Sequence, residues 1–322
     1  MNHYDVTAIG ELLIDLTQNG ISKQGNPVLE ANPGGAPCNV LSFLAKMGHR
    51  VGFLGKVGSD GFGDQLEAAL VETGIDTRGL CRDEAVHTTL AVVHTKPDGD
   101  RDFSFYRNPG ADVMLAEQEL DESMIRSSKI LHFGSLSMTE EPCRSATKRA
   151  IAIAEEAGIL RSFDPNLREP LWDSLDAARQ QILYGLAHCD ILKISDNEIL
   201  WLTGKQDYDA AVAWIQENYH IPLIFLTQGR DGSRAYCGTV RAEQSGFCVK
   251  TVETTGAGDT FMGAMLHQIL EMGWTPYSRK ELESMLRFAN AAAAAVTTRA
   301  GALRVMPTLD EIQTILVPNT KI

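Results

Sequence analysis

The feature that most constrains the fold of this 322-residue chain is an alternation of short apolar runs with longer amphipathic segments. In its second half, apolar runs at 130–133, 159–163 and 191–194 are separated by helical patterns at 143–157 and 177–187. An apolar run of four or five residues is typical of a strand that is buried on both faces. The alternation therefore predicts an α/β fold, with a mostly parallel sheet and helices on both of its faces.

The beginning of the chain carries the first candidate ligand contact. An apolar run at 6–10 predicts a strand, and Glu11-Leu12-Leu13-Ile14-Asp15 follows directly. Open α/β sheets bind ligands at the carboxyl ends of their strands. We therefore expect Asp15 to accept hydrogen bonds from ligand hydroxyls, with a solvated loop carboxylate as the alternative.

A glycine pair precedes the next predicted helix, within Asn32-Pro33-Gly34-Gly35-Ala36-Pro37-Cys38-Asn39. Adjacent glycines can form a wall without side chains against a ligand, and an asparagine can both donate and accept hydrogen bonds. The residues alone also fit an ordinary turn at the start of a helix.

The segment around Gly256-Ala257-Gly258-Asp259 predicts a strand, a tight turn and a helix in succession. Side chains alternate over 247–252, and apolar residues recur at helical spacing from Phe261 onward. The glycines allow a close approach of the backbone to a ligand, and the start of the helix favours an anion. A carboxylate placed there indicates a general base; the alternative for Asp259 is a charge that merely stabilises the helix start.

Two further segments are rich in β-strand signals. The runs 88–95 and 102–107 flank Pro97-Asp98-Gly99-Asp100, as in a hairpin. Together with the stretch from about 12 to 30, this hairpin departs from the strand–helix alternation. We assign both pieces to a small β-sheet.

Composition excludes several classes of protein. The formal net charge of −13 and the pI near 5.1 argue against a nucleic-acid or acidic-membrane partner. No apolar run is long enough to span a membrane, and no targeting pattern opens the chain, so we expect a cytoplasmic protein. The six cysteines are scattered and no histidines cluster at metal spacing, so we expect free thiols and no zinc site.

Two motifs resemble those of the ribokinase-like (PfkB) carbohydrate kinases. Thr254-Thr-Gly-Ala-Gly-Asp-Thr-Phe-x-Gly-Ala264 resembles the C-terminal signature of this family, and the glycines from Gly34 to Gly63 resemble its N-terminal signature. The resemblance implies a single ribokinase-like α/β domain over 1–322. It also implies a small β-sheet lid formed by residues 12–33 and 86–110.

The resemblance assigns roles to the matched residues. It implies that Asp259 is the general base and that the amides of Gly256, Ala257 and Gly258 form an anion hole for the γ-phosphate of ATP. The residues that we expect to contact the sugar are Asp15, Gly34, Gly35, Asn39, Arg107, Asn166 and Arg168. The residues that we expect to contact ATP are Lys193, Glu198, Thr227, Gly229, Gly232 and Asn290.

Two positions depart from the family pattern and concern its metal ions. Glu198 matches the glutamate that orients the Mg²⁺ shell through water, but Ser195 replaces the usual asparagine, and this pair also fits a helix capping box. The resemblance implies a K⁺ site beside the anion hole, formed by Glu253, Thr255 and Gly301, although the family most often has an aspartate in place of Glu253.

Within the family, the chain is most similar to the fructokinases. The similarity rests on the Gly10-to-Asp15 start, the Phe105-to-Asp112 run and the Phe163-to-Arg168 run. It implies ATP-dependent phosphorylation of a primary hydroxyl of fructose. The alternatives are a 2-keto-3-deoxygluconate kinase, an aminoimidazole riboside kinase and a non-catalytic sugar or nucleotide sensor. The exposed edges of the lid strands further predict a homodimer formed through the lid.

Overall fold

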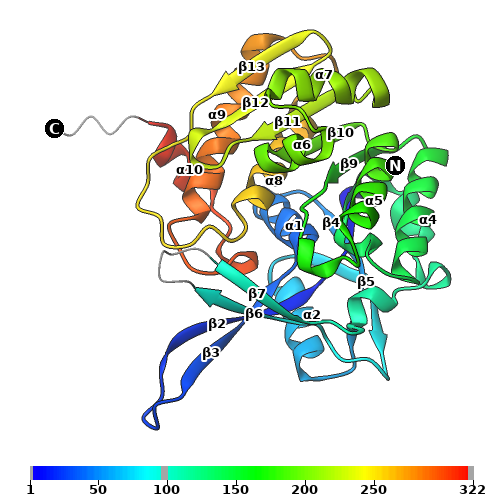
Figure 1. Cartoon of the computed structure of the whole chain (residues 1–322), viewed down its shortest axis with the longest axis vertical. Helices are drawn as coiled ribbons and strands as arrows, with labels where there is room; N and C mark the ends of the chain where they lie inside the picture. The colour runs from blue at the N-terminus through cyan, green and yellow to red at the C-terminus, as the bar shows by residue number, and fades with distance from the viewer. Residues whose placement is uncertain (1–2, 96–100, 318–322) are drawn as a thin grey trace.

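The computed structural model describes residues 3–95 and 101–317, and its centre is a nine-stranded sheet (Figure 1). The order of its strands is β13-β12-β11-β10-β9-β8-β1-β4-β5. The strands are β1 Tyr4–Ile9, β4 Val51–Gly58, β5 Ile75–Asp83, β8 Ser128–Gly134, β9 Leu160–Asp164, β10 Ile191–Ser195, β11 Leu223–Thr227, β12 Ser233–Cys237 and β13 Val240–Gln244.

Seven neighbouring strands of this sheet, from β11 to β5, run parallel. The predicted α/β fold with a mostly parallel sheet is thereby confirmed. Only β12 and β13 run antiparallel to their neighbours among the described strands of this sheet. The alternation of strands with helices does not predict this edge hairpin, because its strands are joined by a short turn.

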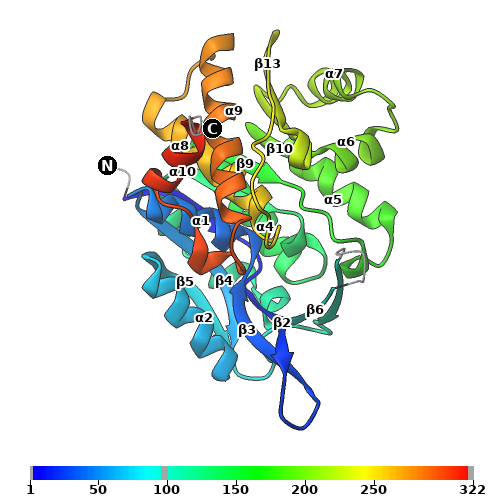
Figure 2. The same cartoon turned by 90° about the vertical axis from the view of Figure 1, so that its left-hand side faces the viewer.

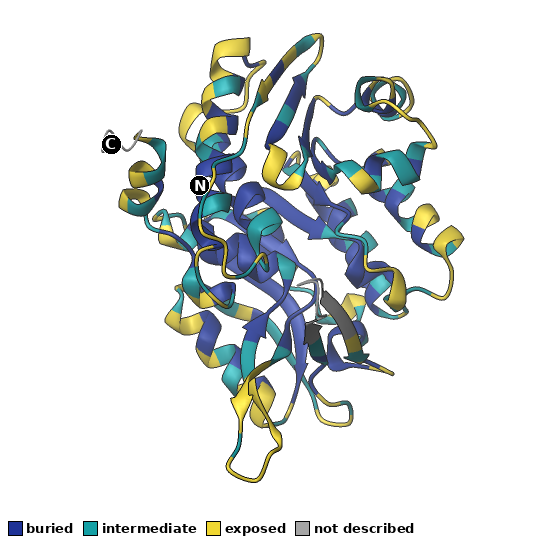
Figure 3. Ribbon diagram, turned by 60° about the vertical axis from the view of Figure 1, so that its left-hand side comes forward, coloured by how far each residue is buried: buried dark blue, intermediate teal, exposed yellow. Residues whose placement is uncertain are grey.

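The helices lie on both faces of the sheet (Figure 2). One face is covered by α1 Ala36–Lys46, α2 Gly61–Glu72, α8 Ala257–Met272, α9 Arg279–Val296 and α10 Leu309–Leu316. The other is covered by α3 Glu122–Arg126, α4 Cys143–Glu156, α5 Leu175–Ala187, α6 Asp196–Thr203 and α7 Tyr208–Tyr219. Successive residues of a strand enter opposite cores: Phe225 packs on the first side and Leu226 on the second. Figure 3 shows the resulting buried interior.

The small sheet has four strands in the order β3-β2-β6-β7. Its strands are β2 Leu13–Ile21, β3 Pro27–Gly34, β6 Leu90–Thr95 and β7 Arg101–Tyr106. The β2–β3 hairpin projects from the body of the protein, and its tip is exposed (Figures 2 and 3). The predicted turn at 97–100 lies outside the described residues.

The strand predicted over 247–252 is wrong. Residues 245–253, which come directly after β13, are described and form no strand. Instead, the amides of Val252 and Glu253 donate to the carbonyl of Thr297, at the end of α9. Phe247 packs against the core beneath the guanidinium of Arg287. The alternation in sequence therefore reflects an extended segment that lies along α9.

Two further expectations concern the chain as a whole. All six cysteines lie within the described residues, and each is a free thiol, as predicted. Across residues 3–95 and 101–317, the helices are too short or too polar to cross a membrane.

Candidate active site

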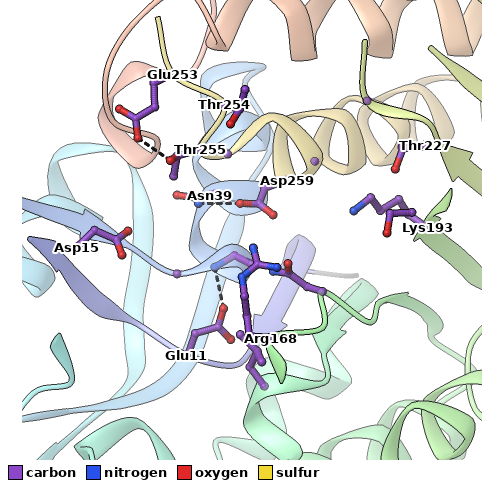
Figure 4. Close-up of a pocket in the computed structure, with 18 of the residues that line it drawn as sticks. Glu11, Asp15, Asn39, Arg168, Lys193, Thr227, Glu253, Thr254, Thr255 and Asp259 are labelled. Atoms are coloured by element: carbon purple, nitrogen blue, oxygen red, sulfur yellow. Dashed lines mark hydrogen bonds between the residues drawn. The ribbon is translucent and has the colours of Figure 1, made fainter. Parts of the chain in front are cut away.

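The main cavity has a volume of about 660 Å³ and lies at the carboxyl ends of the central strands. Glu11 follows β1, Arg168 follows β9, and Thr227 ends β11, so each strand delivers one polar side chain to this edge. The small sheet supplies Asp15 from β2 and Phe105 from β7. Figure 4 shows that Asp15 and Lys193 lie on opposite sides of the central pair, Asn39 and Asp259.

The glycine turn before α8 forms one wall of this cavity. Gly256 has a φ of 77°, in the left-handed region, and a Cβ there would lie 2.9 Å from the Cβ of Ala302. Glycine is therefore required both by the backbone and by the close packing. The amide of Ala257 donates to the carbonyl of Thr254 at 3.2 Å. The amides of Gly258 and Asp259 belong to the first helical turn, where no intrahelical acceptor exists.

Asp259 is positioned by Asn39, which is 220 residues away in the sequence. The Nδ2 atom of Asn39 donates to Oδ2 of Asp259 at 2.8 Å. This contact exists because α1 packs directly on α8: a Cβ at Gly263 would lie 3.0 Å from the side chain of Phe43. The Oδ1 atom of Asn39 is buried and has no partner among the described residues, so it can accept a hydrogen bond from a ligand hydroxyl.

The environment of Asp259 suits a proton acceptor. Burial raises the pKa of its carboxyl group above the ordinary value, although the hydrogen bond from Asn39 and the charges of Lys193 and Arg168 act in the opposite direction. A carboxylate with a raised pKa is a stronger base than one in water.

A buried ion pair lies next to the glycine turn. The ammonium group of Lys193 is 2.9 Å from Oδ2 of Asp164, and both side chains are buried. Burial alone would lower the pKa of Lys193, but Asp164 and Glu198 hold it above its ordinary value. A Cβ on Gly258 would lie 3.1 Å from Nζ. The absence of a side chain at Gly258 therefore lets a positive charge lie against the first turn of α8.

Glu198 forms the capping box, which is one of the two roles that its sequence context left open, and it also lines the main cavity. Its Oε2 atom accepts hydrogen bonds from the amide and the hydroxyl of Ser195, which completes a capping box at the start of α6. Its Oε1 atom accepts from the amide of Leu167 at 2.7 Å. Burial would raise the pKa of Glu198, but Lys193 and these hydrogen bonds lower it, so the carboxylate that lines the cavity is ionised.

The two glycines before α1 allow close contacts within the protein. A Cβ on Gly34 would lie 2.3 Å from Oδ2 of Asp15, and one on Gly35 would lie 2.4 Å from the carbonyl of Glu11. Gly35 also has a φ of 133°. Glycine at these positions lets the chain bring Asp15 and Asn39 to the same cavity.

Asn166 and Arg168 lie in the loop after β9 and line the cavity. Asn166 has a φ of 45°, and its backbone amide donates to Oδ1 of Asp164 at 3.2 Å. Arg168 is exposed, and Figure 4 shows its side chain extending into the cavity below Asp259.

Arg107 does not line the main cavity, and the sugar contact expected of it stays a prediction. The guanidinium group is buried and donates to the carboxylate of Asp112, with an Nε–Oδ2 distance of 2.8 Å. It also donates to the hydroxyl of Thr139 and to the carbonyl of Leu136. The reason is electrostatic: a buried arginine is drawn to the carboxylate that neutralises it.

A second cavity of about 250 Å³ adjoins the first. Thr227, Gly229 and Gly258 line both cavities, which therefore form one continuous cleft. Gly232 and Asn290 line only the second one, together with Phe247, Ala293 and Ala294.

The amide of Asn290 is engaged by the protein. Its Oδ1 atom accepts from the hydroxyl of Ser233 at 2.8 Å, and its Nδ2 atom donates to the carbonyls of Gln244 and Ser245. Asn290 therefore holds the wall of the second cavity in place.

Glu253, Thr255 and Gly301 meet beside the glycine turn, as expected. One carboxylate oxygen of Glu253 accepts from the hydroxyl of Thr255 at 2.5 Å, and the other accepts from the amide of Gly301 at 2.9 Å. Figure 4 shows the first of these bonds. Glu253 thereby joins the loop before α8 to the loop after α9.

Glu11, a buried carboxyl at the floor of the cavity, was not among the residues expected from the sequence. It accepts a hydrogen bond from the amide of Ala36 at 2.8 Å. Burial raises the pKa of Glu11 to about 7. The sequence does place Glu11 directly after the first predicted strand, where ligands bind. Asp15 lies in the same segment, and the prediction named Asp15 and not Glu11.

Comparison with known proteins places this geometry in context. The family model described as pfkB family carbohydrate kinase matches residues 4–309. The chain is 41% identical over 316 residues to probable fructokinase-4 of Arabidopsis thaliana, which covers 98% of this chain and 97% of that protein. It is 40% identical to fructokinase-2 of Solanum lycopersicum, over 97% of this chain and 95% of that protein.

Solved structures agree with these relatives. The fructokinase of Xylella fastidiosa with bound ATP superimposes with a TM-score of 0.89 at 30% identity, over 97% of this chain and 98% of that one. The fructokinase of Vibrio cholerae O395, bound to fructose, ADP and a calcium ion, has a TM-score of 0.88 at 30% identity, over 98% and 100% of the two chains. A putative ribokinase II of E. coli, in complex with ATP and Mg²⁺, has a TM-score of 0.86 at 28% identity, over 97% and 99% of the two chains.

Proposed function

Because this chain belongs to the pfkB family of carbohydrate kinases, we propose that it is a fructokinase, which transfers the γ-phosphate of ATP to a primary hydroxyl of fructose. The observation that carries the proposal is the pair of Asn39 and Asp259 in the main cavity, next to Gly258, which lines both cavities. Fructose is favoured over the other sugars because the relatives at about 41% identity are fructokinases.

The two cavities suit the two substrates. The second cavity, lined by small and apolar side chains, accepts the adenine ring, and Asn290 keeps its wall in place. Thr227, Gly229 and Gly258 line the passage through which the phosphates extend. The main cavity then receives the sugar next to Asp15 and Asn39, and Asn166 and Arg168 also line this cavity.

Catalysis follows from this arrangement. Asp259 takes the proton of the attacking hydroxyl while Asn39 fixes the orientation of its carboxylate. The amides of Gly258 and Asp259 in the first turn of α8 and the ammonium of Lys193 stabilise the negative charge on the migrating phosphoryl group. Phosphoryl transfer needs mainly positioning and charge stabilisation, and these groups supply both.

Mg²⁺, when bound with ATP, neutralises part of the charge on the phosphates. The ionised Glu198 and the neighbouring Asp196 line the cavity and are oxygen donors of the kind that Mg²⁺ prefers. Both oxygens of Glu198 already accept hydrogen bonds from the protein, so its contribution to a Mg²⁺ shell would pass through water.

A K⁺ ion is proposed for the loops joined by Glu253. A Vibrio cholerae fructokinase variant bound a potassium ion together with fructose and ADP. In this chain the loops that carry Glu253, Thr255 and Gly301 would hold the ion, although the carboxylate of Glu253 already joins the two loops by itself. Replacing K⁺ by Na⁺ in the assay should lower kcat if the ion takes part.

We assign the whole chain, 1–322, to one domain in which the small sheet acts as a lid. Segments 12–33 and 86–110 supply the lid, and Asp15 and Phe105 reach the cavity from it. A closed lid keeps water from the phosphoryl group. ATP hydrolysis in the absence of sugar should therefore be slow.

The same sheet is the proposed interface of a homodimer. Its outer strands β3 and β7 each have only one neighbouring strand in the described sheet, and Ile21 and Leu29 are 60% and 44% exposed. Exposed edges and apolar side chains favour pairing with a second copy. Sedimentation should give twice the mass of 35.2 kDa, and Ile21→Lys should shift it toward the monomer.

A cytoplasmic location suits a kinase that requires ATP, and six free thiols suit a reducing compartment. Fractionation of cells that express the tagged protein would test this location.

The activity itself is tested with a panel of sugars. The purified chain should phosphorylate fructose with ATP and Mg²⁺, with a higher kcat/KM than for 2-keto-3-deoxygluconate or aminoimidazole riboside. Binding of sugar and ATP without any turnover would instead indicate a sensor. A preference for another sugar would keep the kinase assignment and remove fructose from it.

A further inference from the structure

His49, His267 and Glu271 form a cluster near the amino ends of the strands of the large sheet, whereas the candidate active site lies at their carboxyl ends. His49 lies between α1 and β4, at the amino end of β4, whereas the main cavity lies at the carboxyl ends of the strands. His267 and Glu271 lie in the last two turns of α8, which begins at the cavity and runs away from it. The chain thus brings together residues that are 218 positions apart.

The three side chains converge on one point. The Nε2 atom of His49 is 2.8 Å from the Nδ1 atom of His267. One nitrogen of each imidazole ring and one carboxylate oxygen of Glu271 all lie within 4.8 Å of one another. His267 and Glu271 are four residues apart on one helix, so they project from the same face.

We propose that this cluster binds one divalent transition-metal ion of the Zn²⁺ class, with two imidazole nitrogens and one carboxylate oxygen as ligands and water in the fourth position. Zn²⁺ binds imidazole nitrogen at about 2.0–2.1 Å and often has three protein ligands and an open position. Two ligands of a tetrahedral ion are about 3.3 Å apart. The two nitrogens, which share a hydrogen bond at 2.8 Å, need to separate only by about half an ångström.

The surroundings of His49 support this site. Its other ring nitrogen lies 3.9 Å from Oδ2 of Asp5. Asp5 is held in turn by the amide of Arg50 at 2.9 Å and by the ammonium of Lys129 at 2.8 Å. A carboxylate behind a metal-bound histidine orients the ring and strengthens its donor nitrogen.

Access also suits a ligand set. Glu271 is exposed, so an ion can reach the cluster from solvent.

Binding would connect the two helices that carry the Asn39–Asp259 pair. Asn39 lies in the first turn of α1, and Asp259 lies in the first turn of α8. The cluster joins the end of α8 to the turn that follows α1. An ion at this point should stabilise the folded chain, because it binds the native arrangement and not separated residues. This inference does not depend on the sugar that the enzyme uses.

The test uses the full chain, purified without a polyhistidine tag and freed of metal with a chelator that is then removed. Isothermal titration with ZnCl₂ in ATP-free buffer should show one ion per chain, and ZnCl₂ should raise the melting temperature. MgCl₂ at the same concentration should not raise it through this site, because Mg²⁺ prefers oxygen ligands.

Matched variants locate the ion. His267→Gln should abolish binding. Glu271→Gln, at an exposed position that leaves the histidine pair intact, should weaken binding at least tenfold without changing the melting temperature of the metal-free protein. Two controls change exposed residues outside the cluster: the side chain of His87 is 93% exposed, and Cys248 is an exposed thiol. His87→Gln and Cys248→Ser should both bind the ion like the wild type. Absence of binding to the wild type, or unchanged binding to His267→Gln and Glu271→Gln, would show that the two histidines form only a structural hydrogen bond.

Discussion

The two cavities of the cleft differ in how they are built, although they share a wall. The main cavity contains ionisable groups from four segments of the chain (11–15, 168, 193–198 and 253–259), and several of them, such as Glu11 and Lys193, are buried. The second cavity is lined by glycine, alanine, phenylalanine and a few neutral polar groups, and its one charged residue, Arg230, is 97% exposed. Buried charges are unfavourable unless they are paired or perform chemistry. The difference therefore separates a region for catalysis from one for binding alone.

The largest expected effect follows from removing the base of the main cavity. Asp259→Asn keeps the shape and the contact with Asn39 but removes the proton acceptor. General bases contribute about 10²- to 10⁴-fold, so kcat should fall by this factor while the KM for fructose changes little. Steady-state kinetics and the melting temperature should be measured on the same protein. A folded variant with the wild-type kcat would reduce Asp259 to a charge at the helix start and would remove the catalytic half of the comparison.

Glu11 tests whether a buried charge in the main cavity opposes stability. Its pKa of about 7 in the folded chain lies above the ordinary value of 4.5 for an exposed carboxyl, so the native state holds the proton more tightly. This stabilisation is present in full below pH 4.5 and is lost as the pH rises through about 7. Ionisation of Glu11 therefore lowers the free energy of unfolding by at most about 3 kcal/mol on going from acidic to alkaline pH.

Glu11→Gln should flatten this dependence, because the amide oxygen can still accept the hydrogen bond from Ala36 but no longer ionises. Urea unfolding at pH 5, 6, 7 and 8 measures the free energy of unfolding of each protein. The exposed Glu217→Gln serves as the control and should follow the wild type. Equal pH slopes for wild type and Glu11→Gln would mean that Glu11 is not buried as a neutral acid.

The second cavity should respond to shape and not to charge. Ala294→Leu places a larger side chain in the proposed adenine space. We expect the KM for ATP to rise about tenfold or more, corresponding to roughly 1–3 kcal/mol of overpacking, with a nearly unchanged KM for fructose. Kinetics at varied ATP and saturating fructose would measure it. A rise in the KM for fructose alone would place the sugar, and not the adenine ring of ATP, in this cavity.

The local features of the site could be predicted from the sequence. The strand–helix alternation identified the fold, and the glycine turn before Asp259 was recognised from its residues. The partners of these residues could not be predicted, since they depend on packing between distant segments. Asn39 meets Asp259 across 220 positions, and nothing near either residue specifies that contact.

Two other features could not be predicted for the same reason. The sequence of residues 247–252 alternates as a strand does, but no neighbouring strand is available among the described residues, so the segment lies along α9. Arg107 follows a strand that leads toward the cavity, yet Asp112, five residues later, neutralises it in the interior. In each case local pattern identified the residue type, and tertiary packing decided what it contacts.

The smallest expected effect concerns the hydrogen bond that joins the two halves of the catalytic centre, from α1 to α8. Asn39 donates to the ionised form of Asp259, and this bond lowers the pKa of that carboxyl against the effect of burial. Asn39→Ala should therefore raise the pKa of Asp259 further, so that the acid limb of the kcat profile moves to higher pH. The rate should fall more at acidic than at alkaline pH, measured at saturating fructose because the same variant loses a sugar contact.

Ser42→Ala is a matched control on the same helix. The hydroxyl of Ser42 donates to the carbonyl of Leu303 and not to Asp259, so its loss should affect stability without moving the acid limb. An identical acid limb in Asn39→Ala would mean that the hydrogen bond positions Asp259 without changing its pKa. The raised pKa of Asp259 would then be due to burial and not to Asn39.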